Sequence, residues 1–446
     1  MRWHFQCVGA AVLAALSDAP AAAQPCLEQR ITPESTFSFG YFSETVAIDG
    51  DQVIVGQPTL AHIGSAFLFD FNQQTGWTQV QHAVAPDGAP GDTWCSDGVA
   101  IDGEWAAITS RPHQHQGYPG AGAVWMLRRL GSEWNFEQEI LPPEEVGGFS
   151  GRVQIDDSRL VVTKVGFVFV YDFDGRAWNL RQTIPQPYPG LIAYGWSVSI
   201  DSDVLVVGAP DDGSMCDDPK LGEFGVSGLV FVYRFNGTEW VQEQLLAPSD
   251  FGCGRHFGTS VAVSEETIIA TAQNPVATYV FEYDQESSQW IETAIFPGVG
   301  PESGARPHAA AIEGDWAVIG DDSDDEAHVF HRQPDGSWVL VDLLQPPQAL
   351  WFGQAVAIDQ GRAIIGAFGE DGGHGAAYIY RLNAPSADLN CDGAVNGLDL
   401  GNLLANWSIP PDMPGCQGDT PCASDINADG LVNGLDLGIL LANWSL

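Results

Sequence analysis

Short apolar runs separated by acidic turns recur along most of this chain. In the clearest copy, residues 194–210 read YGWSVSIDSDVLVVGAP. Val198 and Ile200 alternate with polar residues, which is the pattern of a half-buried strand, and the apolar run 204–207 follows a tight acidic turn. The unit returns about every 50 residues, a period typical of propeller or solenoid repeats. Its other copies begin at residues 46, 99, 153, 261, 310 and 356.

The second half of each repeat is equally regular. An alternating strand, such as LVFVYRF at 229–235, leads into a turn and then a tryptophan. Asn236-Gly237 is one such turn, and Asn-Gly supplies the positive φ angles of a two-residue hairpin. Each repeat is therefore predicted to be a four-stranded antiparallel sheet, and a ring of such sheets buries the faces that one sheet leaves open. The tryptophans predicted to pack between neighbouring sheets are Trp77, Trp134, Trp178, Trp240, Trp290 and Trp338.

The seventh repeat stops after its third strand, at Leu382. Residues 26–33, CLEQRITP, have the pattern of a fourth strand, VQEQLLAP at 241–248. The fold class predicted for residues 24–383 is thus an all-β seven-bladed propeller, in which the N-terminal strand completes the last blade and removes an open sheet edge.

Phe-Gly pairs and one literal Gly-Ala-Pro occur along the repeats, namely Phe39-Gly40, Phe257-Gly258, Phe352-Gly353 and Gly208-Ala209-Pro210. These motifs resemble the FG-GAP repeats of the integrin alpha-subunit propeller and its bacterial relatives. Some blades of that family carry an Asp-rich calcium loop between the first two strands. Here that turn is short, so no calcium ligands are assigned to the ring from the resemblance. The acidic run Asp321, Asp322, Asp324, Asp325 and Glu326 either holds a cation or forms a solvated loop.

A different pattern begins after residue 383. DLNCDGAVNGLD at 388–399 returns as DINADGLVNGLD at 425–436, and each copy places oxygen-bearing residues at the spacing of a calcium loop with a glycine at its sharp turn. We predict two Ca²⁺ sites. The ligands of the first are Asp388, Asn390, Asp392, the Ala394 carbonyl, Asn396 and Asp399; those of the second are Asp425, Asn427, Asp429, the Leu431 carbonyl, Asn433 and Asp436.

A helix is predicted after each loop. Its apolar positions follow helical spacing and are expected to pack the two helices together; they are Leu400, Leu403, Leu404 and Trp407, then Leu437, Leu440, Leu441 and Trp444.

The duplicated loop and helix resemble type I dockerin modules, small EF-hand-like domains that bind calcium and dock secreted proteins onto cohesins. Many dockerins carry a Ser/Thr pair at loop positions 10 and 11, where this chain has Gly397-Leu398 and Gly434-Leu435. The expected partner of residues 384–446 is therefore a cohesin-like or another extracellular protein.

Composition limits the possible partners. The formal net charge is -41, and a surface this acidic repels nucleic acid and anionic membranes. Residues 1–23 have the pattern of a signal peptide, which predicts a secreted or cell-surface protein, and no later stretch is long and apolar enough to span a membrane. Removal of Cys7 leaves an odd number of cysteines, with Cys216–Cys253 and Cys416–Cys422 as candidate disulfides.

Two classes of function follow. The regular repeats favour a non-catalytic binding or adhesion propeller, with a protein or polysaccharide ligand, carried on a calcium-dependent attachment module. The alternative is a polysaccharide-degrading enzyme, a glycoside hydrolase or lyase, with its active site on the propeller. Paired carboxylates can come from distant blades, so no catalytic residues are assigned.

Overall fold

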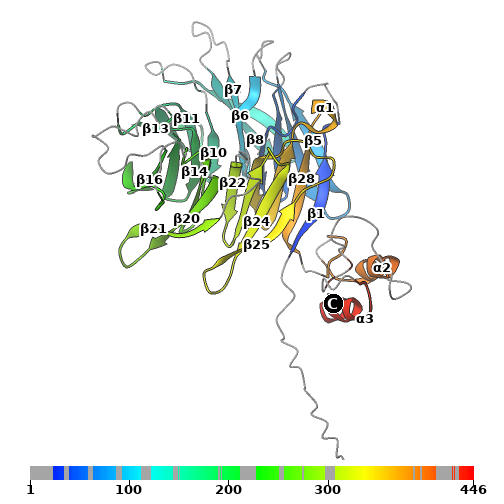
Figure 1. Ribbon diagram of the computed structural model, residues 1–446. Coiled ribbons are helices and arrows are strands. Elements are labelled where there is room, and N and C mark those ends of the chain that lie inside the picture. Colours follow the sequence, from blue (N-terminus) through cyan, green and yellow to red (C-terminus); the bar gives the residue numbers. More distant parts are fainter. Residues whose placement is uncertain are drawn as a thin grey trace, which may run out of the picture. The chain divides into compact units, whose positions relative to one another are not determined.

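The computed structural model contains two compact units, Pro25–Asn383 and a C-terminal unit that includes Ala384–Leu446 (Figure 1). The described residues are 24–34, 40–58, 64–86, 93–111, 122–143, 149, 151–188, 191, 193–210, 228–250, 256–273, 276–296, 307–384, 387–391, 394–407, 424, 426 and 431–445.

The first unit consists of seven four-stranded sheets, numbered here as blades 1 to 7 in the order of the repeats. Blade 1 is β2 (Thr45–Asp49), β3 (Gln52–Gln57), β4 (Ser65–Asn72) and β5 (Gly76–Ala83). Blade 2 is β6 (Thr93–Asp102), β7 (Trp105–Arg111), β8 (Ala123–Leu130) and β9 (Glu133–Ile140). Blade 3 is β10 (Val153–Asp156), β11 (Arg159–Lys164), β12 (Phe167–Phe173) and β13 (Trp178–Pro185).

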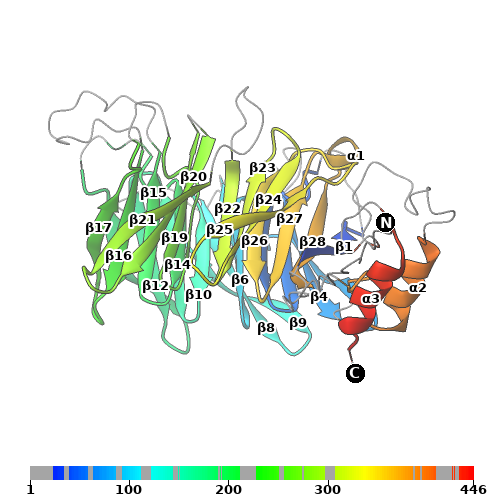
Figure 2. The same cartoon turned by 60° about the horizontal axis from the view of Figure 1, so that its bottom comes forward.

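The same order continues through the next three sheets. Blade 4 is β14 (Ser197–Asp201), β15 (Val204–Ala209), β16 (Leu229–Phe235) and β17 (Trp240–Leu246). Blade 5 is β18 (Val261–Ser264), β19 (Thr267–Gln273), β20 (Val276–Asp284) and β21 (Gln289–Phe296). Blade 6 is β22 (Pro307–Glu313), β23 (Trp316–Asp321), β24 (Glu326–Arg332) and β25 (Trp338–Leu344). The first strand of every blade lines a central channel. Figure 2 shows β22, β23 and β24 of blade 6 side by side.

The seventh blade joins the two ends of the propeller. It consists of β26 (Phe352–Asp359), β27 (Arg362–Ala367) and β28 (Ala376–Ala384), with β1 (Gln24–Ile31) paired beside β28. The predicted seven-bladed ring and its N-terminal closure are therefore confirmed. The short helix α1 (Glu370–Gly373) lies between β27 and β28.

Ion pairs fasten the closing strand. Glu28 of β1 accepts hydrogen bonds from Arg362 Nε at 3.0 Å and from Arg381 Nη2 at 2.6 Å. The Trp77 indole of blade 1 donates to the same carboxylate at 3.1 Å. The Glu28 side chain is almost fully buried, so this one carboxylate connects blade 7, β1 and blade 1 in a poorly hydrated position.

The hydrophobic core lies between the blades. One cluster joins Val161 and Val170 of blade 3 to Val207 and Phe231 of blade 4, and comparable clusters fill the other six junctions. The predicted position of the tryptophans is confirmed, because Trp77, Trp134, Trp178, Trp240 and Trp290 are buried in these clusters and Trp338 packs at the edge of one.

Five junctions also carry a Gln–Trp clasp, in which a glutamine amide binds both backbone groups of a tryptophan in the next blade. Gln182 accepts a hydrogen bond from Trp240 N at 2.7 Å and donates to Trp240 O at 2.9 Å. The other clasps are Gln29–Trp77, Gln81–Trp134, Gln138–Trp178 and Gln244–Trp290. At the two junctions of blade 6, Ala294 and Asp342 occupy the glutamine position.

The Phe-Gly and Gly-Ala-Pro motifs meet across the blade junctions. A Cβ atom on Gly208 would lie 2.2 Å from the Gly258 carbonyl oxygen of the next blade, so this position requires glycine. Gly258 has a φ of +87°, and the ring of Phe257 is fully buried. Each Phe-Gly turn, here called an FG turn, thus packs against the backbone of the preceding blade.

In blade 1 the structure corrects the predicted FG turn. Phe42-Ser43, and not Phe39-Gly40, occupies the position, because Phe42 is fully buried and the Ser43 carbonyl lies beside Gly366 of blade 7. Phe39 lies outside the described residues. Like Phe257 and Phe352, Phe42 stands four residues before the first valine of its repeat, and that spacing was the usable signal.

A second ring of contacts joins the turns between the first and second strands. In each blade the last residue of the first strand accepts a hydrogen bond from a backbone N–H at the start of the next blade's turn, where φ is positive. The seven acceptors, which we call the acidic ring, are Asp49, Asp102, Asp156, Asp201, Ser264, Glu313 and Asp359. The Asp359 carboxylate binds Gly50 N and so completes the circle.

The odd number of cysteines after removal of Cys7 predicted at least one cysteine without a disulfide partner in the chain. Cys95 is a free, fully buried thiol, and burial raises its pKa. Cys26 and Cys391 are disulfide-bonded. The candidate pairs Cys216–Cys253 and Cys416–Cys422 lie outside the described residues.

The C-terminal unit contains α2 (Gly397–Ala405) and α3 (Gly434–Ala442). Within the described part of the chain, no helix is both long and apolar enough to cross a membrane.

Replacing Glu28 tests the closure. We expect Glu28→Ala to lower the free energy of unfolding by about 3 kcal/mol, because it leaves two partly buried arginines without their shared carboxylate. Denaturant unfolding of the purified chain measures this. Leu27→Ala, at an exposed position of the same strand, is the control and should change stability by no more than about 0.5 kcal/mol. Equal effects of the two substitutions would contradict the closure model.

The acidic ring predicts an unusual dependence on pH. Burial, with repulsion from Asp201 and Asp157, raises the pKa of Asp156 to about 6, and burial raises the pKa of Asp359 to about 6. An unfolded aspartate titrates near about 3.9, so between about pH 4 and 6 the folded chain binds more protons than the unfolded chain. The stability supplied by these two groups is complete below about pH 4 and is lost as the pH rises through about 6.

We therefore expect Tm to gain less on lowering the pH from 7 to 5 in Asp156→Asn/Asp359→Asn than in the wild type. The asparagines keep an acceptor for the turn but cannot take up a proton. Thermal melts across this range provide the measurement, with the exposed Asp315→Asn as control. Parallel pH profiles for the double variant and the wild type would rule out this role of the ring.

Candidate functional site

Both C-terminal helices begin with the last residues of the predicted calcium loops. Asn396 caps α2 by accepting from Leu398 N at 2.9 Å, while Asp399 Oδ2 accepts from Asn396 N at 2.7 Å. Asn433 and Asp436 repeat this capping box at α3. Asp399 and Asp436 are fully buried.

The described residues of the first loop have the chemistry that calcium requires. Asp399 Oδ1 also accepts from Leu389 N at 2.7 Å and Asn390 N at 3.2 Å, which brings the first and last ligand positions together. Asp388 is buried as well. All the predicted metal-ligand atoms are oxygens, a set that fits Ca²⁺. Four predicted ligands, Asp392, Asp425, Asn427 and Asp429, lie outside the described residues.

Only part of each predicted apolar stripe packs between the helices. Leu403 and Leu440 are fully buried, and Leu400, Leu437 and Trp407 pack around them. The prediction was wrong for Leu404, Leu441 and Trp444, which are exposed because both helices are short and only one face of each meets the other.

The duplication also produces a matched pair of exposed leucines. Leu398 is 64% exposed and Leu435 is 63% exposed, each at the second helical position. These two side chains, with Leu404 and Leu441, form four related apolar positions on the two helices. Exposed apolar groups of this kind are candidates for partner contacts.

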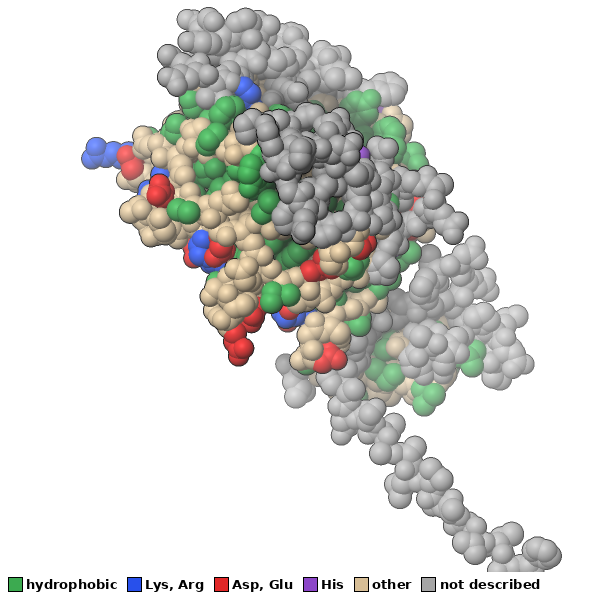
Figure 3. Space-filling model, turned by 60° about the vertical axis from the view of Figure 1, so that its left-hand side comes forward, with side chains coloured by type: hydrophobic (Ala, Val, Ile, Leu, Met, Phe, Trp, Pro, Cys, Tyr) green, Lys and Arg blue, Asp and Glu red, His purple; other side chains and the backbone are tan. Residues whose placement is uncertain are grey.

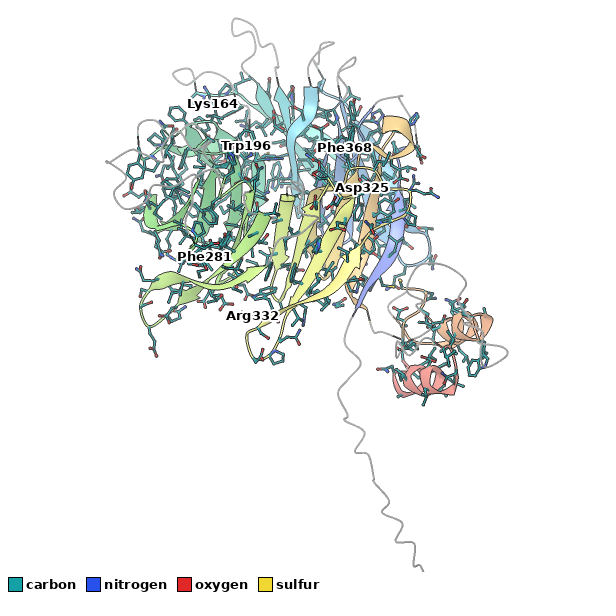
Figure 4. The ribbon with its side chains drawn as sticks, in the orientation of Figure 1. Lys164, Trp196, Phe281, Asp325, Arg332 and Phe368 are labelled. Atoms are coloured by element: carbon teal, nitrogen blue, oxygen red, sulfur yellow. The ribbon has the colours of Figure 1, made fainter. Side chains whose placement is uncertain are left out.

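In the propeller, strand order decides which loops gather together. Because the strands of a blade alternate in direction, connections from second to third strands and from fourth strands to the next blade emerge at one end of the ring, called here the loop face. The acidic ring lies at the other end. In Figure 4, Trp196, Phe368 and Asp325 lie toward the loop face, whereas Phe281 and Arg332 lie toward the opposite end.

The channel opens at the loop face beside a group of charged residues that the sequence analysis missed. Glu44 and Arg152 line a cavity of about 120 Å³. Burial and the nearby Asp97 raise the pKa of Glu44 to about 7, while Arg152 opposes this shift. The available signal was a charged residue one or two positions before the first valine in three consecutive repeats, namely Glu44, Asp97 and Arg152.

Two exposed tryptophans flank FG turns on the loop face. Trp351 is 47% exposed and stacks on Phe368 with ring centroids 4.6 Å apart. Trp196 follows Gly195 in blade 4 and is about half exposed. Exposed aromatic faces are common anchors for protein and sugar ligands.

The acidic run of blade 6 is not a solvated loop throughout. Asp321 is 0% exposed and Glu326 is 9% exposed. Carboxylate oxygens of Asp321, Asp324 and Glu326 lie within 4.8 Å of one another. Burial raises the pKa of each, with added repulsion from neighbouring carboxylates, which for Asp324 is that of Asp325.

Basic residues are mostly held in ion pairs on the blades. Arg234 binds Asp203 and Glu243, and Arg181 binds Asp172. On the face shown in Figure 3, Lys and Arg side chains accordingly lie next to Asp and Glu side chains.

Comparison with known families links part of the chain to the FG-GAP repeat, whose profile matches residues 350–380. No curated protein matches the sequence. Among solved structures, a β-propeller domain from Myceliophteria thermophila has a TM-score of 0.51 at 13% identity, over 79% of this chain and 100% of that one. A protein from Lactobacillus plantarum has a TM-score of 0.48 at 13% identity, over 75% of this chain and 97% of that one.

A putative 6-phosphogluconolactonase from Bacteroides fragilis has a TM-score of 0.47 at 12% identity, over 68% of this chain and 84% of that one. At these identities the likeness concerns the fold alone. The FG-GAP match covers β26, β27 and part of β28 in blade 7, where Trp351, Phe352 and Gly353 form the FG turn.

Proposed function

We propose that this chain is a secreted, calcium-binding protein whose propeller binds an extracellular protein or polysaccharide and whose C-terminal module attaches it to a partner. The observation that carries the proposal is the duplicated geometry of that module. Asp399 and Asp436 are both buried at the closing position of an oxygen-rich loop, and each is followed by a helix that exposes a leucine at the same place.

In this proposal calcium stabilises the two C-terminal loops, and Leu398 and Leu435 contact the attachment partner. Asp388, Asn390 and Asp399 would supply carboxylate and amide oxygens in the first loop. A bound cation offsets the repulsion between these carboxylates, so the two helices keep the spacing that a partner recognises. Leu398 and Leu435 stand at the positions where related dockerin modules vary their specificity, which favours an apolar partner surface over the hydroxyl-reading surface of many cohesins.

The propeller is proposed to bind its ligand at the loop face. Trp196 and Trp351 each place an indole ring in solvent on this face, and Trp351 is held in place by stacking on Phe368. Supported aromatic faces bind sugars or protein side chains with little loss of side-chain entropy.

Capture from a native secretome by the immobilised full chain tests the attachment. We expect one protein species to bind in calcium, to be lost in chelator, and to be weakened at least about tenfold by Leu398→Ala/Leu435→Ala, since removing buried anchors costs more than about 1 kcal/mol each. Leu340→Ala, at an exposed position on blade 6, is the matched control. Capture that ignores both chelator and the leucine substitutions would refute the attachment role.

A second candidate function is a polysaccharide-degrading enzyme at the channel mouth. The pKa of Glu44, near 7, favours it, because such a carboxyl group can donate a proton at neutral pH. The cavity of about 120 Å³ argues against it, since pockets for small ligands usually exceed about 300 Å³.

Reducing-sugar release from a panel of glycans decides between the two functions. We expect no release by the wild-type chain. Release that disappears in Glu44→Gln, and persists in Glu104→Gln at an exposed turn, would establish the enzyme and displace the binding function.

A further inference from the structure

The hairpin between β23 and β24 departs from the repeat in one respect. Asp321 pairs with Glu326 at the open end of these two strands. None of the other six blades has an acidic residue at this pair of positions. Their residues are Gln57–Ser65, Ser110–Ala123, Lys164–Phe167, Ala209–Leu229, Ala272–Ala277 and Ala367–Ala376. The propeller fold therefore does not require carboxylates here.

These carboxylates lack compensation within the described part of the chain. Asp321 Oδ1 accepts from Ser323 N at 3.0 Å, but its Oδ2 atom is buried without a hydrogen-bond partner. Asp324 Oδ2 is also buried and unpartnered. No Lys or Arg among the described residues forms an ion pair with Asp321, Asp324 or Glu326. A buried carboxylate without a partner costs several kcal/mol, so the arrangement is incomplete as it stands.

The neighbouring His328 does not satisfy the two unpartnered carboxylate oxygens. Its Nε2 atom lies 3.5 Å from Glu326 Oε1, and its Nδ1 atom is itself buried without a partner.

We propose that Asp321, Asp324 and Glu326 bind a Ca²⁺ ion at the loop face of blade 6. Three carboxylate oxygens within 4.8 Å of one another match the size of a calcium shell, because ligands on opposite sides of an ion at about 2.4 Å are about 4.8 Å apart. An all-carboxylate set suits a hard cation, and backbone carbonyls and water complete the shell of such ions.

This site is separate from both calcium loops of the C-terminal module. It also differs in position from the calcium loop of FG-GAP propellers, since it joins the second and third strands of a blade and not the first and second. It does not depend on the proposed attachment function.

The hairpin also holds the aromatic pair on the loop face. Asp325 Oδ1 accepts hydrogen bonds from the backbone N–H groups of Trp351 and Phe352 in blade 7. A Cβ atom on Gly320 would lie 1.9 Å from the Gly353 carbonyl, which shows how tightly the two turns pack. Figure 4 shows Asp325 close to Phe368, on which Trp351 stacks. A cation in the hairpin would thus fix the base of an exposed aromatic surface.

Calcium titration of the full chain by calorimetry tests the site. We expect Asp321→Asn/Asp324→Asn to bind about one Ca²⁺ fewer per chain than the wild type and to lose part of the calcium-induced rise in Tm. Asparagine keeps the shape of aspartate, and Asp335→Asn, at an exposed turn of the same blade, is the control that should bind as the wild type does. The same comparison in an Asp399→Asn/Asp436→Asn background separates this ion from those of the C-terminal module.

Equal calcium binding by the hairpin variant and the control would overturn the proposal. Hydrogen exchange on the unmodified full chain gives a second test that needs no variant. We expect calcium to slow exchange at residues 320–328 and 350–353, and unchanged exchange in both segments would also overturn the site.

Discussion

The structure depends on each blade being completed by the next one. The turn between the first two strands of a blade directs a backbone N–H away from its own sheet, and only a side chain of the preceding blade accepts from it. Asp359 and Gly50 make this contact across the closure. At the opposite end of the ring, the FG turns pack closely against the backbone of the preceding blade. No blade is satisfied alone, so folding of the propeller is a property of the closed circle.

Most of this architecture could be predicted from the sequence, because the apolar pattern and the turn residues of each repeat are determined by its own strands and turns. Alternating apolar positions define strands, and the resemblance of 26–33 to a fourth strand revealed the closure. The FG turn of blade 1 was misplaced because Ser43 stands where other repeats have glycine, and a φ of 76° at a serine leaves no mark in the sequence. The acidic ring was visible as repeated terminal Asp residues, but its partners lie one blade away, and such contacts cannot be derived without the fold.

The candidate sites lie where the repeats differ from one another. Blade 6 has two facing carboxylates that no other blade has at those positions, and blades 1 to 3 place charges at the channel mouth. Burial of Asp321 could not be predicted from the sequence, since a run of five acidic residues normally points to solvent. In the C-terminal module the spacing of the loops predicted the capping carboxylates, whereas exposure of Leu404 and Leu441 depended on how little of each short helix its partner covers.

The distribution of the Gln–Trp clasps makes the ring mechanically uneven. Five consecutive junctions have a clasp near the rim, while Ala294 and Asp342 leave both sides of blade 6 without one. The junction of blades 5 and 6 has the Arg332–Glu282 ion pair at 2.7 Å in addition to its core packing. A load applied across the propeller would therefore meet no clasp on either side of blade 6, the blade whose hairpin contacts the Trp351 turn.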